Sequence, residues 1–311
     1  MLFLSQQEVA DLLDLDNLLT GLENGFRELS AGRASVPPRI AARAPSGLLG
    51  AMPGFVDGVL ASKLVSVFPA NHASGLPSHQ ALIVLFDHRT GSPLAVMDGT
   101  HITAARTGAA AAVSTKALGR MDARVLAVLG AGVQGRSHID SHARVRDFRE
   151  IRVASRTFDN ARRLASAVGA TASASFEEAT DGADVICFCT DAAVPFSRRQ
   201  WFRPGAHITS VGGSAEGPEL DAETVAMADI LAVEHRGAFG QYPAGAHELQ
   251  GVDAGRGVEL GEILSGTHPG RTSDEQVTLY KSTGHAVEDA VAAGMVYEAA
   301  LAAGAGTTVQ L

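Results

Sequence analysis

The stretch AVLGAGVQGRSHI, residues 127–139, joins an apolar run to a glycine-rich turn. Its three glycines, Gly130, Gly132 and Gly135, have the G-x-G-x-x-G spacing of loops that bring backbone amides close to a pyrophosphate at the start of a helix. Glycines at this spacing also serve plain tight turns, so the motif depends on its context. Here an apolar strand precedes the turn, a helix follows it, and a second strand covers residues 151–154. The sequence therefore predicts a dinucleotide site at this turn.

The residues after the second strand indicate which dinucleotide binds. An NAD site usually carries Asp or Glu there, where a carboxylate accepts hydrogen bonds from the ribose hydroxyls. This chain has Ser155-Arg156-Thr157 instead. Arg156 can pair with a 2′-phosphate, and the two hydroxyls can add hydrogen bonds. Asp159 lies further on, where capping of the next helix is the simpler explanation. The sequence favours NADP(H), with NAD(H) as the alternative.

Strands and helices alternate along the second half of the chain, which predicts an α/β fold with a Rossmann-type, doubly wound parallel sheet. The expected strands are residues 125–130, 151–156, 184–190, 207–213, 230–235 and 277–282, and the expected helices include 133–145 and 158–169. A last helix over residues 286–303 lies beyond this unit, and we expect it to return to the first domain.

The first part of the chain predicts a mixed α+β domain. The capping-box pattern Ser5-Gln-Gln-Glu8 begins a short helix, and a second helix is expected from Asp16 to about Ser30. The expected strands are residues 48–56, 59–68, 80–87 and 93–99, the last two forming a hairpin, and the expected helix after them is 102–118. We therefore place the domain boundaries after residues 118 and 284.

Composition and charge narrow the class of protein. The 311 residues include 25 basic and 34 acidic side chains, a net charge of −9. This charge argues against nucleic acid or an anionic membrane surface as the main partner. No apolar segment approaches the length that crosses a bilayer, and the first residues lack the basic segment of a secretory signal. Cys187 and Cys189, in the apolar run VICFC, are expected to be core thiols of a cytoplasmic protein rather than a metal or redox pair.

Lys63 is the first candidate for chemistry. It lies in VLASKLVSV, where alternation places it on one strand face with the apolar residues Val59, Ala61, Val65 and Val67. A lone ammonium in an apolar row is costly unless it has a partner, and burial would lower its pKa toward neutrality. The alternative is a lysine that faces solvent or extends along a sheet edge. The pattern alone leaves both open.

Two arginines are candidate carboxylate clamps. Arg106 lies on the alanine-rich helix, on a stripe with Ile102, Ala109 and Val113, and is either a structural ion-pair partner or a clamp. Arg39 follows the rigid Pro37-Pro38 and could be a second clamp. Taken singly, each is also compatible with an ordinary surface arginine.

The histidines give no metal prediction. His138 and His142 have i, i+4 spacing, but the H-E-x-x-H pattern and a third ligand are missing. We therefore expect them on a solvated helix face. His79 follows Pro77-Ser78 at the start of a strand, where it is a surface histidine or a substrate contact.

Taken in order, these segments resemble the ornithine cyclodeaminase / mu-crystallin family along nearly the whole chain. The matching stretches are Pro37-Pro38-Arg39, SKLVSVFP, LPSHQALIVLFD, AVMDGTHITAARTGA, GAGVQG, VASRT and VTLYKSTGHAVEDAVAA. The resemblance implies a homodimer, with a substrate and dimerisation domain built from residues 1–118 and the last helix, and a dinucleotide-binding domain over residues 119–284.

The resemblance also implies roles for single residues. Arg39, Lys63 and Arg106 would surround the carboxylate of an amino or imino acid. The cofactor would be contacted by Thr107, Val133, Gln134, Thr190 and Ser282, together with the glycine turn and residues 155–157. Apart from what the resemblance implies, we expect the substrate to meet Met52, Ser78, His79, Gln80 and Ser214.

Members of the family differ in activity. Cyclodeaminases resemble one another in a Gly-Gly-Asp whose carboxylate handles the substrate amine, and here Ser214 stands in that place, with Glu216 as a substitute of unproven reach. The sequence therefore favours an NAD(P)H-dependent imine (ketimine) reductase or amino-acid dehydrogenase acting on a small 2-imino or 2-amino acid. The alternatives are an ornithine or lysine cyclodeaminase with recycled NAD and a non-catalytic protein that binds NADPH or a small ligand.

Overall fold

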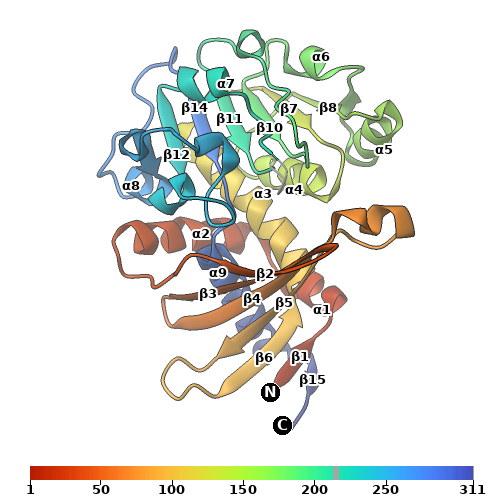
Figure 1. The fold of residues 1–311 in the computed structure, drawn as a ribbon, viewed down its shortest axis with the longest axis vertical. Coiled ribbons are helices and arrows are strands. Elements are labelled where there is room, and N and C mark those ends of the chain that lie inside the picture. Colours follow the sequence, from red (N-terminus) through yellow and green to blue (C-terminus); the bar gives the residue numbers. More distant parts are fainter. Residues whose placement is uncertain (213–216, 311) are drawn as a thin grey trace. The chain divides into compact units, whose positions relative to one another are not determined.

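The chain divides into two compact units in the computed structural model, which describes residues 1–212 and 217–310 (Figure 1). One unit contains residues 1–106 and 285–311, and the other contains residues 107–284. The first division falls inside a single helix, α3 (Gly99–Leu118), between Arg106 and Thr107. The boundary expected after residue 118 assigned this whole helix to the first domain. The functional roles given to the domains remain predictions.

The first unit is built on a seven-stranded sheet in the order β15-β1-β6-β5-β4-β3-β2. Its strands are β1 (Leu2–Leu4), β2 (Ile40–Ala44), β3 (Gly47–Val56), β4 (Val59–Val67), β5 (His79–Phe86), β6 (Pro93–Asp98) and β15 (Thr307–Thr308). Strands β2 to β6 form an antiparallel meander, while β1 pairs in parallel with β6. The predicted β5–β6 hairpin is confirmed, and Gly91 adopts a positive φ of 72° in its turn.

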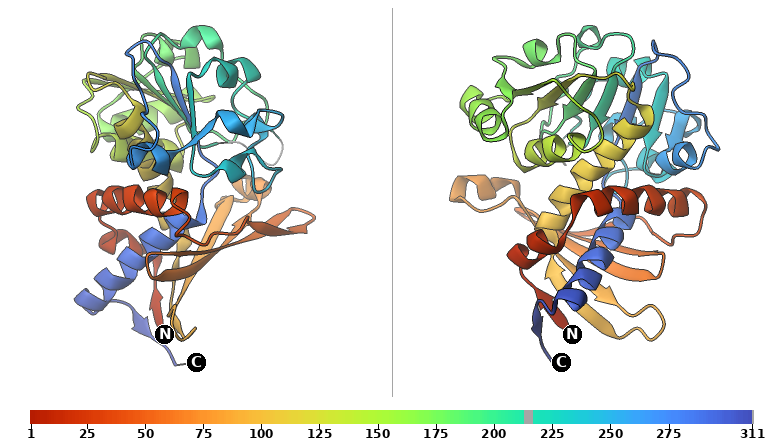
Figure 2. Two further views of the ribbon diagram at one scale, coloured as in Figure 1. Left: turned by 90° about the vertical axis from the view of Figure 1, so that its left-hand side faces the viewer. Right: turned by 180° about the vertical axis from the view of Figure 1, so that it is seen from behind.

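Helices cover one face of this sheet. They are α1 (Gln6–Leu12), α2 (Leu15–Ser30) and α9 (Ala286–Ala303), and a 3-10 turn, η1 (Pro69–Ser74), links β4 to β5. The capping box of Ser5 and Glu8 is present at the start of α1, as predicted. Figure 2 shows α2 and α9 packed together on the same side of the sheet. Their approach is close because a Cβ at Gly25 of α2 would lie 2.9 Å from Val291 of α9.

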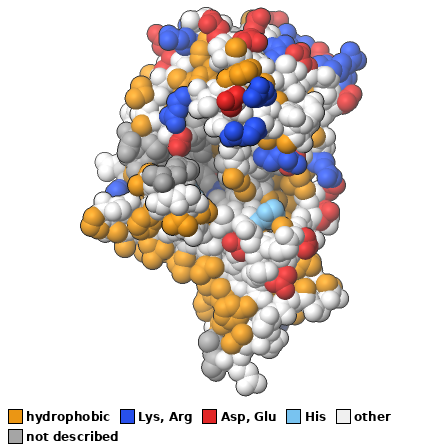
Figure 3. All heavy atoms as spheres, turned by 90° about the vertical axis from the view of Figure 1, so that its right-hand side faces the viewer, with side chains coloured by type: hydrophobic (Ala, Val, Ile, Leu, Met, Phe, Trp, Pro, Cys, Tyr) orange, Lys and Arg blue, Asp and Glu red, His pale blue; other side chains and the backbone are white. Residues whose placement is uncertain are grey.

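The opposite face of the sheet is apolar and exposed. The strand register places Ile40, Ala51, Leu64 and Leu82 in one row across four strands. Ile40 and Leu82 are 69% and 52% exposed, and Leu49, which points to the same side as Ala51, is 51% exposed. Figure 3 shows hydrophobic side chains gathered along one side of this unit. An apolar surface of this kind usually marks a place where another surface binds.

The second unit is a parallel sheet of eight strands in the order β13-β12-β14-β11-β10-β7-β8-β9. The strands are β7 (Val125–Leu129), β8 (Glu150–Ala154), β9 (Thr171–Ala172), β10 (Val185–Phe188), β11 (His207–Ser210), β12 (Ile230–Val233), β13 (Gly257–Glu259) and β14 (Thr278–Lys281). The order of the strands in the sheet reverses between β7 and β10, as in dinucleotide-binding folds. The predicted Rossmann-type sheet with an α+β unit is confirmed.

The helices of the second unit join its strands. They are the later part of α3, α4 (Val133–His142), α5 (Phe158–Val168), α6 (Phe176–Thr180), α7 (Ala222–Met227) and α8 (Leu260–Leu264). Short 3-10 turns are η2 (Arg199–Trp201), η3 (Arg236–Phe239), η4 (His247–Leu249) and η5 (Ala254–Arg256). None of the described helices has the length and apolar character of a membrane span.

His138 and His142 are buried, so the prediction of a solvated helix face is wrong. The Nε2 of His142 lies 2.9 Å from the Thr115 hydroxyl on α3, and its Nδ1 lies 2.8 Å from the His138 carbonyl. The two imidazoles stack with their centroids 5.8 Å apart. Burial lowers the pKa of His138 to about 4 and that of His142 to about 3. Both rings are therefore neutral parts of the core.

Both cysteines are free, and the expectation of core thiols is confirmed for Cys187. Its side chain is buried on β10 with its Sγ 3.5 Å from His142 Nε2, and Cys189 is half-buried. Burial raises the pKa of the Cys187 thiol to about 12. Within residues 1–212 and 217–310, no cluster of His, Cys, Asp and Glu is suited to hold a metal ion.

The buried histidines predict a loss of stability in mild acid. Their ordinary pKa is 6.5, and the folded state lowers it, so the unfolded chain binds more protons below pH 6.5. The stability they confer is complete above pH 6.5 and is lost as the pH falls toward about 4 for His138 and about 3 for His142. Within that range each histidine should lower the free energy of unfolding by about 1.4 kcal/mol per pH unit.

Urea unfolding of the His142→Gln variant between pH 7.5 and 4.5 tests this expectation. Its free energy of unfolding should fall with pH less steeply than that of the natural protein, because one buried imidazole is gone. His88→Gln is the matched control, since His88 is exposed, and it should keep the natural slope. Equal slopes for both variants would contradict the assignment.

Candidate active site

Lys63 is buried on β4, on the face that the sequence alternation predicted, and its side chain is only 2% exposed. Its Nζ lies 3.0 Å from Oδ1 and 2.9 Å from Oδ2 of Asp289, on the first turns of α9. The alternative of a solvent-facing lysine is therefore wrong. An ammonium in this place is tolerated because a carboxylate meets it directly.

Arg106 of α3 joins the same group of side chains. Its Nε donates to Asp289 Oδ1 over 3.0 Å, and its Nη1 donates to Glu288 Oε2 over 2.5 Å. The other oxygen of Glu288 accepts from the backbone amide of His285, the residue that caps α9. We call Lys63, Arg106, Glu288 and Asp289 the charged cluster. Of the two interpretations of Arg106, the ion pair is what the structure shows, and the carboxylate clamp remains a prediction.

The charged cluster holds unusual ionisation states. Burial lowers the pKa of Lys63 to about 8, helped by the nearby positive charges of Arg106 and Arg39 and opposed by Asp289. Burial alone would raise the pKa of Asp289, but Arg106, Lys63 and Arg39 together hold it below its ordinary value. Arg39, which is half-buried, therefore acts on the same two groups. The result is a lysine able to exchange a proton close to neutral pH.

The two acidic members of the charged cluster were not among the predicted site residues. Glu288 and Asp289 lie at the start of the helix predicted from residue 286, and no role was predicted for either of them. A signal was available, because α9 is otherwise almost entirely apolar or small along its buried length. Two adjacent carboxylates in such a helix need buried partners or the positive end of the helix, and both are present here.

The predicted substrate contacts are brought together only in part. Met52 is buried on β3 directly opposite Lys63 in the strand register. His79 lies on the strand face of Lys63, at the start of β5, and its Nδ1 is 3.1 Å from the Ser78 hydroxyl. Gln80 lies on the opposite, outer face with Leu82, so the strand directs it away from Lys63. Ser214, like Glu216, lies outside the described residues.

The glycine turn of the second unit has the backbone that a pyrophosphate site requires. Gly130 has a φ of 121°, and a Cβ there would lie 2.4 Å from the Cys189 carbonyl oxygen. A Cβ at Gly135 would lie 2.0 Å from the Gly130 carbonyl oxygen. These two positions therefore accept only glycine, because a side chain would collide with backbone. The turn follows β7 and touches the residue after β10, and the order of the strands in the sheet reverses between β7 and β10.

The start of α4 remains open to a ligand. Gly132 is its N-cap and provides no side-chain cap, and nothing described lies within 4 Å of the place a Cβ would take. Val133 is 71% exposed, and the buried Oε1 of Gln134 has no hydrogen-bond partner among the described residues. Backbone amides at a helix start and an unused acceptor fit a dinucleotide phosphate and its ribose. The residues present thus suit the cofactor that the motif implies.

The end of β8 presents a basic tip. Ser155 is half-buried, and Arg156 and Thr157 are exposed at the start of α5. Thr157 is the N-cap of α5 but makes no side-chain cap, while Asp159 lies in the first turn and pairs with Arg162. The expectation that Asp159 caps this helix is therefore wrong. Residues 155–157 are Ser, Arg and Thr, and the cofactor preference inferred from them remains a prediction.

Two buried carboxylates hold the strand-end loops that were expected beside the cofactor. The amide and hydroxyl of Thr190 donate to Glu219 Oε2 over 3.1 and 2.7 Å. The Ser282 hydroxyl donates to Glu234 Oε1 over 2.7 Å. The buried Lys281 donates to Glu248 over 3.1 Å and to the Gly212 carbonyl over 2.7 Å. None of Glu219, Glu234, Glu248 and Lys281 was a predicted site residue, because their partners lie far from them in the sequence.

Thr107 is buried on α3, next to a close helix contact. A Cβ at Gly108 would lie 2.4 Å from the Ser137 hydroxyl oxygen of α4, so a glycine is needed for α3 to approach α4. Thr107 is thus next to the glycine that packs against the middle of α4. Its predicted contact with the cofactor remains a prediction.

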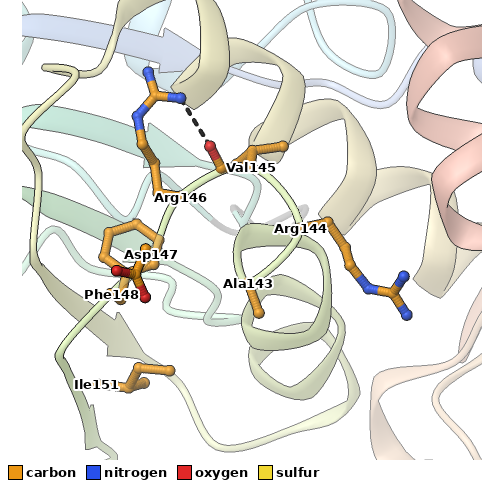
Figure 4. A pocket seen from close by; sticks show the side chains of 7 residues that line it. All are labelled: Ala143, Arg144, Val145, Arg146, Asp147, Phe148 and Ile151. Carbon is orange, nitrogen blue, oxygen red and sulfur yellow. Dashed lines mark hydrogen bonds between the residues drawn. The ribbon is translucent and has the colours of Figure 1, made fainter.

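A shallow pocket of about 480 Å³ lies beside the end of α4, away from these groups (Figure 4). It is lined by residues 143–148 and Ile151. Arg146 in this pocket donates to the carbonyls of Lys116 and Arg120, and so caps the end of α3. Its charge therefore stabilises a helix end, and we assign no ligand to the pocket.

The chain is similar to known proteins along nearly its whole length. Ketimine reductase mu-crystallin of Mus musculus is 40% identical over 307 residues, which cover 95% of this chain and 96% of the relative. Delta(1)-pyrroline-2-carboxylate reductase of Thermococcus litoralis, solved with NADH and L-proline, has a TM-score of 0.93 at 36% identity and covers 99% of this chain and 100% of its own. An archaeal alanine dehydrogenase dimer with bound NAD has a TM-score of 0.92 at 32% identity, with 100% and 99% covered. Residues 1–304 match one family throughout, and the chain belongs to the ornithine cyclodeaminase/mu-crystallin family.

Proposed function

We propose that the protein is an NAD(P)H-dependent oxidoreductase that acts on the C=N or CH–NH bond of a small 2-imino or 2-amino acid. The relatives that support this class are a ketimine reductase, a pyrroline-2-carboxylate reductase and an alanine dehydrogenase. The observation that carries the proposal is the buried ammonium of Lys63, which lies 2.9 and 3.0 Å from the two oxygens of Asp289. Burial and the charges of Arg106 and Arg39 lower the pKa of this ammonium to about 8. Such a group can supply a proton where a substrate nitrogen gains negative charge.

The residues of the first unit take separate roles. A bound reduced nicotinamide supplies the hydride. Lys63 gives its Nζ proton to the substrate nitrogen and is left as a neutral amine. Arg39 and Arg106 hold the substrate carboxylate through charge-assisted hydrogen bonds. In the reverse direction the neutral Lys63 removes the same proton, and the amino acid is oxidised.

The residues of the second unit hold the cofactor. Gly130, Gly132 and Gly135 allow the backbone to approach the pyrophosphate, which meets the amides at the start of α4. Gln134, Thr190 and Ser282 lie around the remaining groups. Arg156, with the hydroxyls of Ser155 and Thr157, contacts a 2′-phosphate, so NADP(H) is preferred over NAD(H). This preference is our proposal for this chain, since the two solved relatives named above hold NADH and NAD.

The proposed place of action is the cytoplasm. The chain keeps both Cys187 and Cys189 as free thiols, which suits a reducing compartment.

Turnover on a substrate panel tests the function. Preformed cyclic 2-imino acids, and 2-oxo acids mixed with ammonia or methylamine, should each be offered with NADPH and with NADH. We expect oxidation of the reduced cofactor, followed by its absorbance, with at least one imino acid. Ammonia release from ornithine without net absorbance change would instead identify a cyclodeaminase. Tight NADPH binding without turnover of any substrate would identify a binding protein.

Arg156→Asp tests the cofactor preference. Loss of a charge-assisted bond to the 2′-phosphate should lower kcat/KM for NADPH about 10- to 100-fold, with a much smaller change for NADH. Arg149→Asp is the matched control, because Arg149 is exposed near the other end of β8. An unchanged NADPH preference in Arg156→Asp would contradict the role given to this arginine.

We also propose that the exposed apolar face of the first unit's sheet binds a second copy of the chain. Ile40, Leu64 and Leu82 expose apolar side chains side by side in this row, and the related archaeal alanine dehydrogenase is a dimer. Face-to-face packing about a twofold axis would bury both copies of this row together.

Substitution of the apolar row tests the dimer. The double variant Leu64→Asp/Leu82→Asp should sediment as a monomer at concentrations where the natural protein is a dimer, because four carboxylates would meet across the axis. Leu301→Asp is the control, since Leu301 is 59% exposed on α9 and not on the sheet. A natural protein that is monomeric at micromolar concentration, or a double variant that remains dimeric, would contradict the proposal.

A further inference from the structure

Asp289 has an unusual position in the charged cluster, because one carboxylate serves two buried cations. Lys63 Nζ lies 2.9 and 3.0 Å from its two oxygens, and Arg106 Nε lies 3.0 Å from Oδ1. All three side chains are at most 5% exposed. The carboxylate therefore fixes the position of the ammonium relative to the guanidinium, with no bulk water to replace it.

Asp289 is also the group that raises the pKa of Lys63, whereas burial, Arg106 and Arg39 lower it. Burial, Arg106 and Arg39 all disfavour the ammonium, and the nearby charge and hydrogen bond of Asp289 favour it. Glu288 does not take this role, because its two oxygens are bonded to Arg106 and to the His285 amide. The charged groups that act on Lys63 are thus Asp289 from α9, Arg106 from α3 and Arg39 from the segment before β2, while Glu288 of α9 pairs with Arg106.

We propose that Asp289 is a positioning residue for the reaction, whose carboxylate keeps Lys63 protonated and in place so that Lys63 can pass its proton to the substrate nitrogen. This inference rests on the proposed function for the identity of the proton acceptor. In the step concerned, the Nζ–H bond of Lys63 breaks as an N–H bond forms on the substrate nitrogen. The imine carbon takes the hydride from the reduced cofactor, the C=N π electrons move to the nitrogen, and Lys63 is left neutral until solvent returns its proton.

The ionisation of Lys63 can be observed without any substrate. The chain has three lysines, Lys63, Lys116 and Lys281, so protein labelled with 13C at the lysine ε carbon gives three NMR signals. The signal of Lys63 is the one that disappears in Lys63→Met. In the natural protein it should titrate near its pKa of about 8.

Asp289→Asn should move the Lys63 titration to lower pH by about one unit or more, since removal of an adjacent opposite charge has an effect of this size. Asp289→Glu, which keeps the charge, should stay closer to the natural midpoint. Glu298→Gln is the matched control on the same helix, because Glu298 is exposed, and it should leave the midpoint unchanged. An unchanged midpoint in Asp289→Asn would overturn the proposal.

A second variant keeps the test decisive if Asp289→Asn does not fold. Arg106→Gln removes a positive charge that lowers the Lys63 pKa, so its midpoint should rise. No rise in Arg106→Gln would show that Lys63 does not respond to this cluster, and would equally overturn the inference.

Activity separates this inference from the proposed function. If the enzyme reduces an imino acid, the alkaline limb of its kcat/KM profile should move to lower pH in Asp289→Asn by the same amount as the NMR midpoint. A moved NMR midpoint with a fixed alkaline limb would overturn the role of Asp289 in the reaction. If no substrate is turned over by the natural protein, the proposed function fails, while the NMR titration still decides whether Asp289 governs the charge of Lys63.

Discussion

Two cationic side chains and two carboxylates are buried together in the first unit. Burial of either the cations or the carboxylates alone would strongly destabilise the fold. An unpaired charge in such a place costs several kcal/mol, so Lys63 and Arg106 require Asp289 and Glu288. The partners are 226 residues apart for Lys63 and Asp289, and 182 for Arg106 and Glu288. This constraint explains why the last helix of the chain belongs to the same unit as β4. The sheet and α9 can pack only if the charges meet.

The same arrangement links stability to chemistry. Burial and two guanidinium groups bring the pKa of Lys63 to about 8, and Asp289 prevents it from falling further. A lysine balanced in this way is charged at neutral pH yet gives up a proton readily. A surface lysine is also charged at neutral pH, but water stabilises its ammonium, so it gives up the proton much less readily. The cluster that holds the unit together is therefore also the group best suited to proton transfer in it.

The second unit depends on backbone geometry at the carboxyl ends of its parallel strands. Gly130 and Gly135 exclude any side chain, so β7 and α4 meet in a turn that a phosphate can approach. Buried carboxylates then fix the neighbouring loops, as Glu219 does for Thr190 and Glu234 for Ser282.

The sequence by itself determined the elements and motifs that depend on neighbouring residues. Four local patterns are present in the structure as predicted. They are the glycine turn, the strand alternation that singled out Lys63, the Ser5 capping box and the β5–β6 hairpin. Strands β1, β2, β9, β13 and β15 were missed. Four of them have only two or three residues, and β2 is a five-residue strand at the sheet edge that is mostly exposed, so each carries little alternation. The tertiary structure alone decided that His142 is buried, that Gln80 faces away from Lys63 and that Asp289 joins Lys63 to Arg106. Those outcomes depend on contacts between distant segments, which no local pattern records.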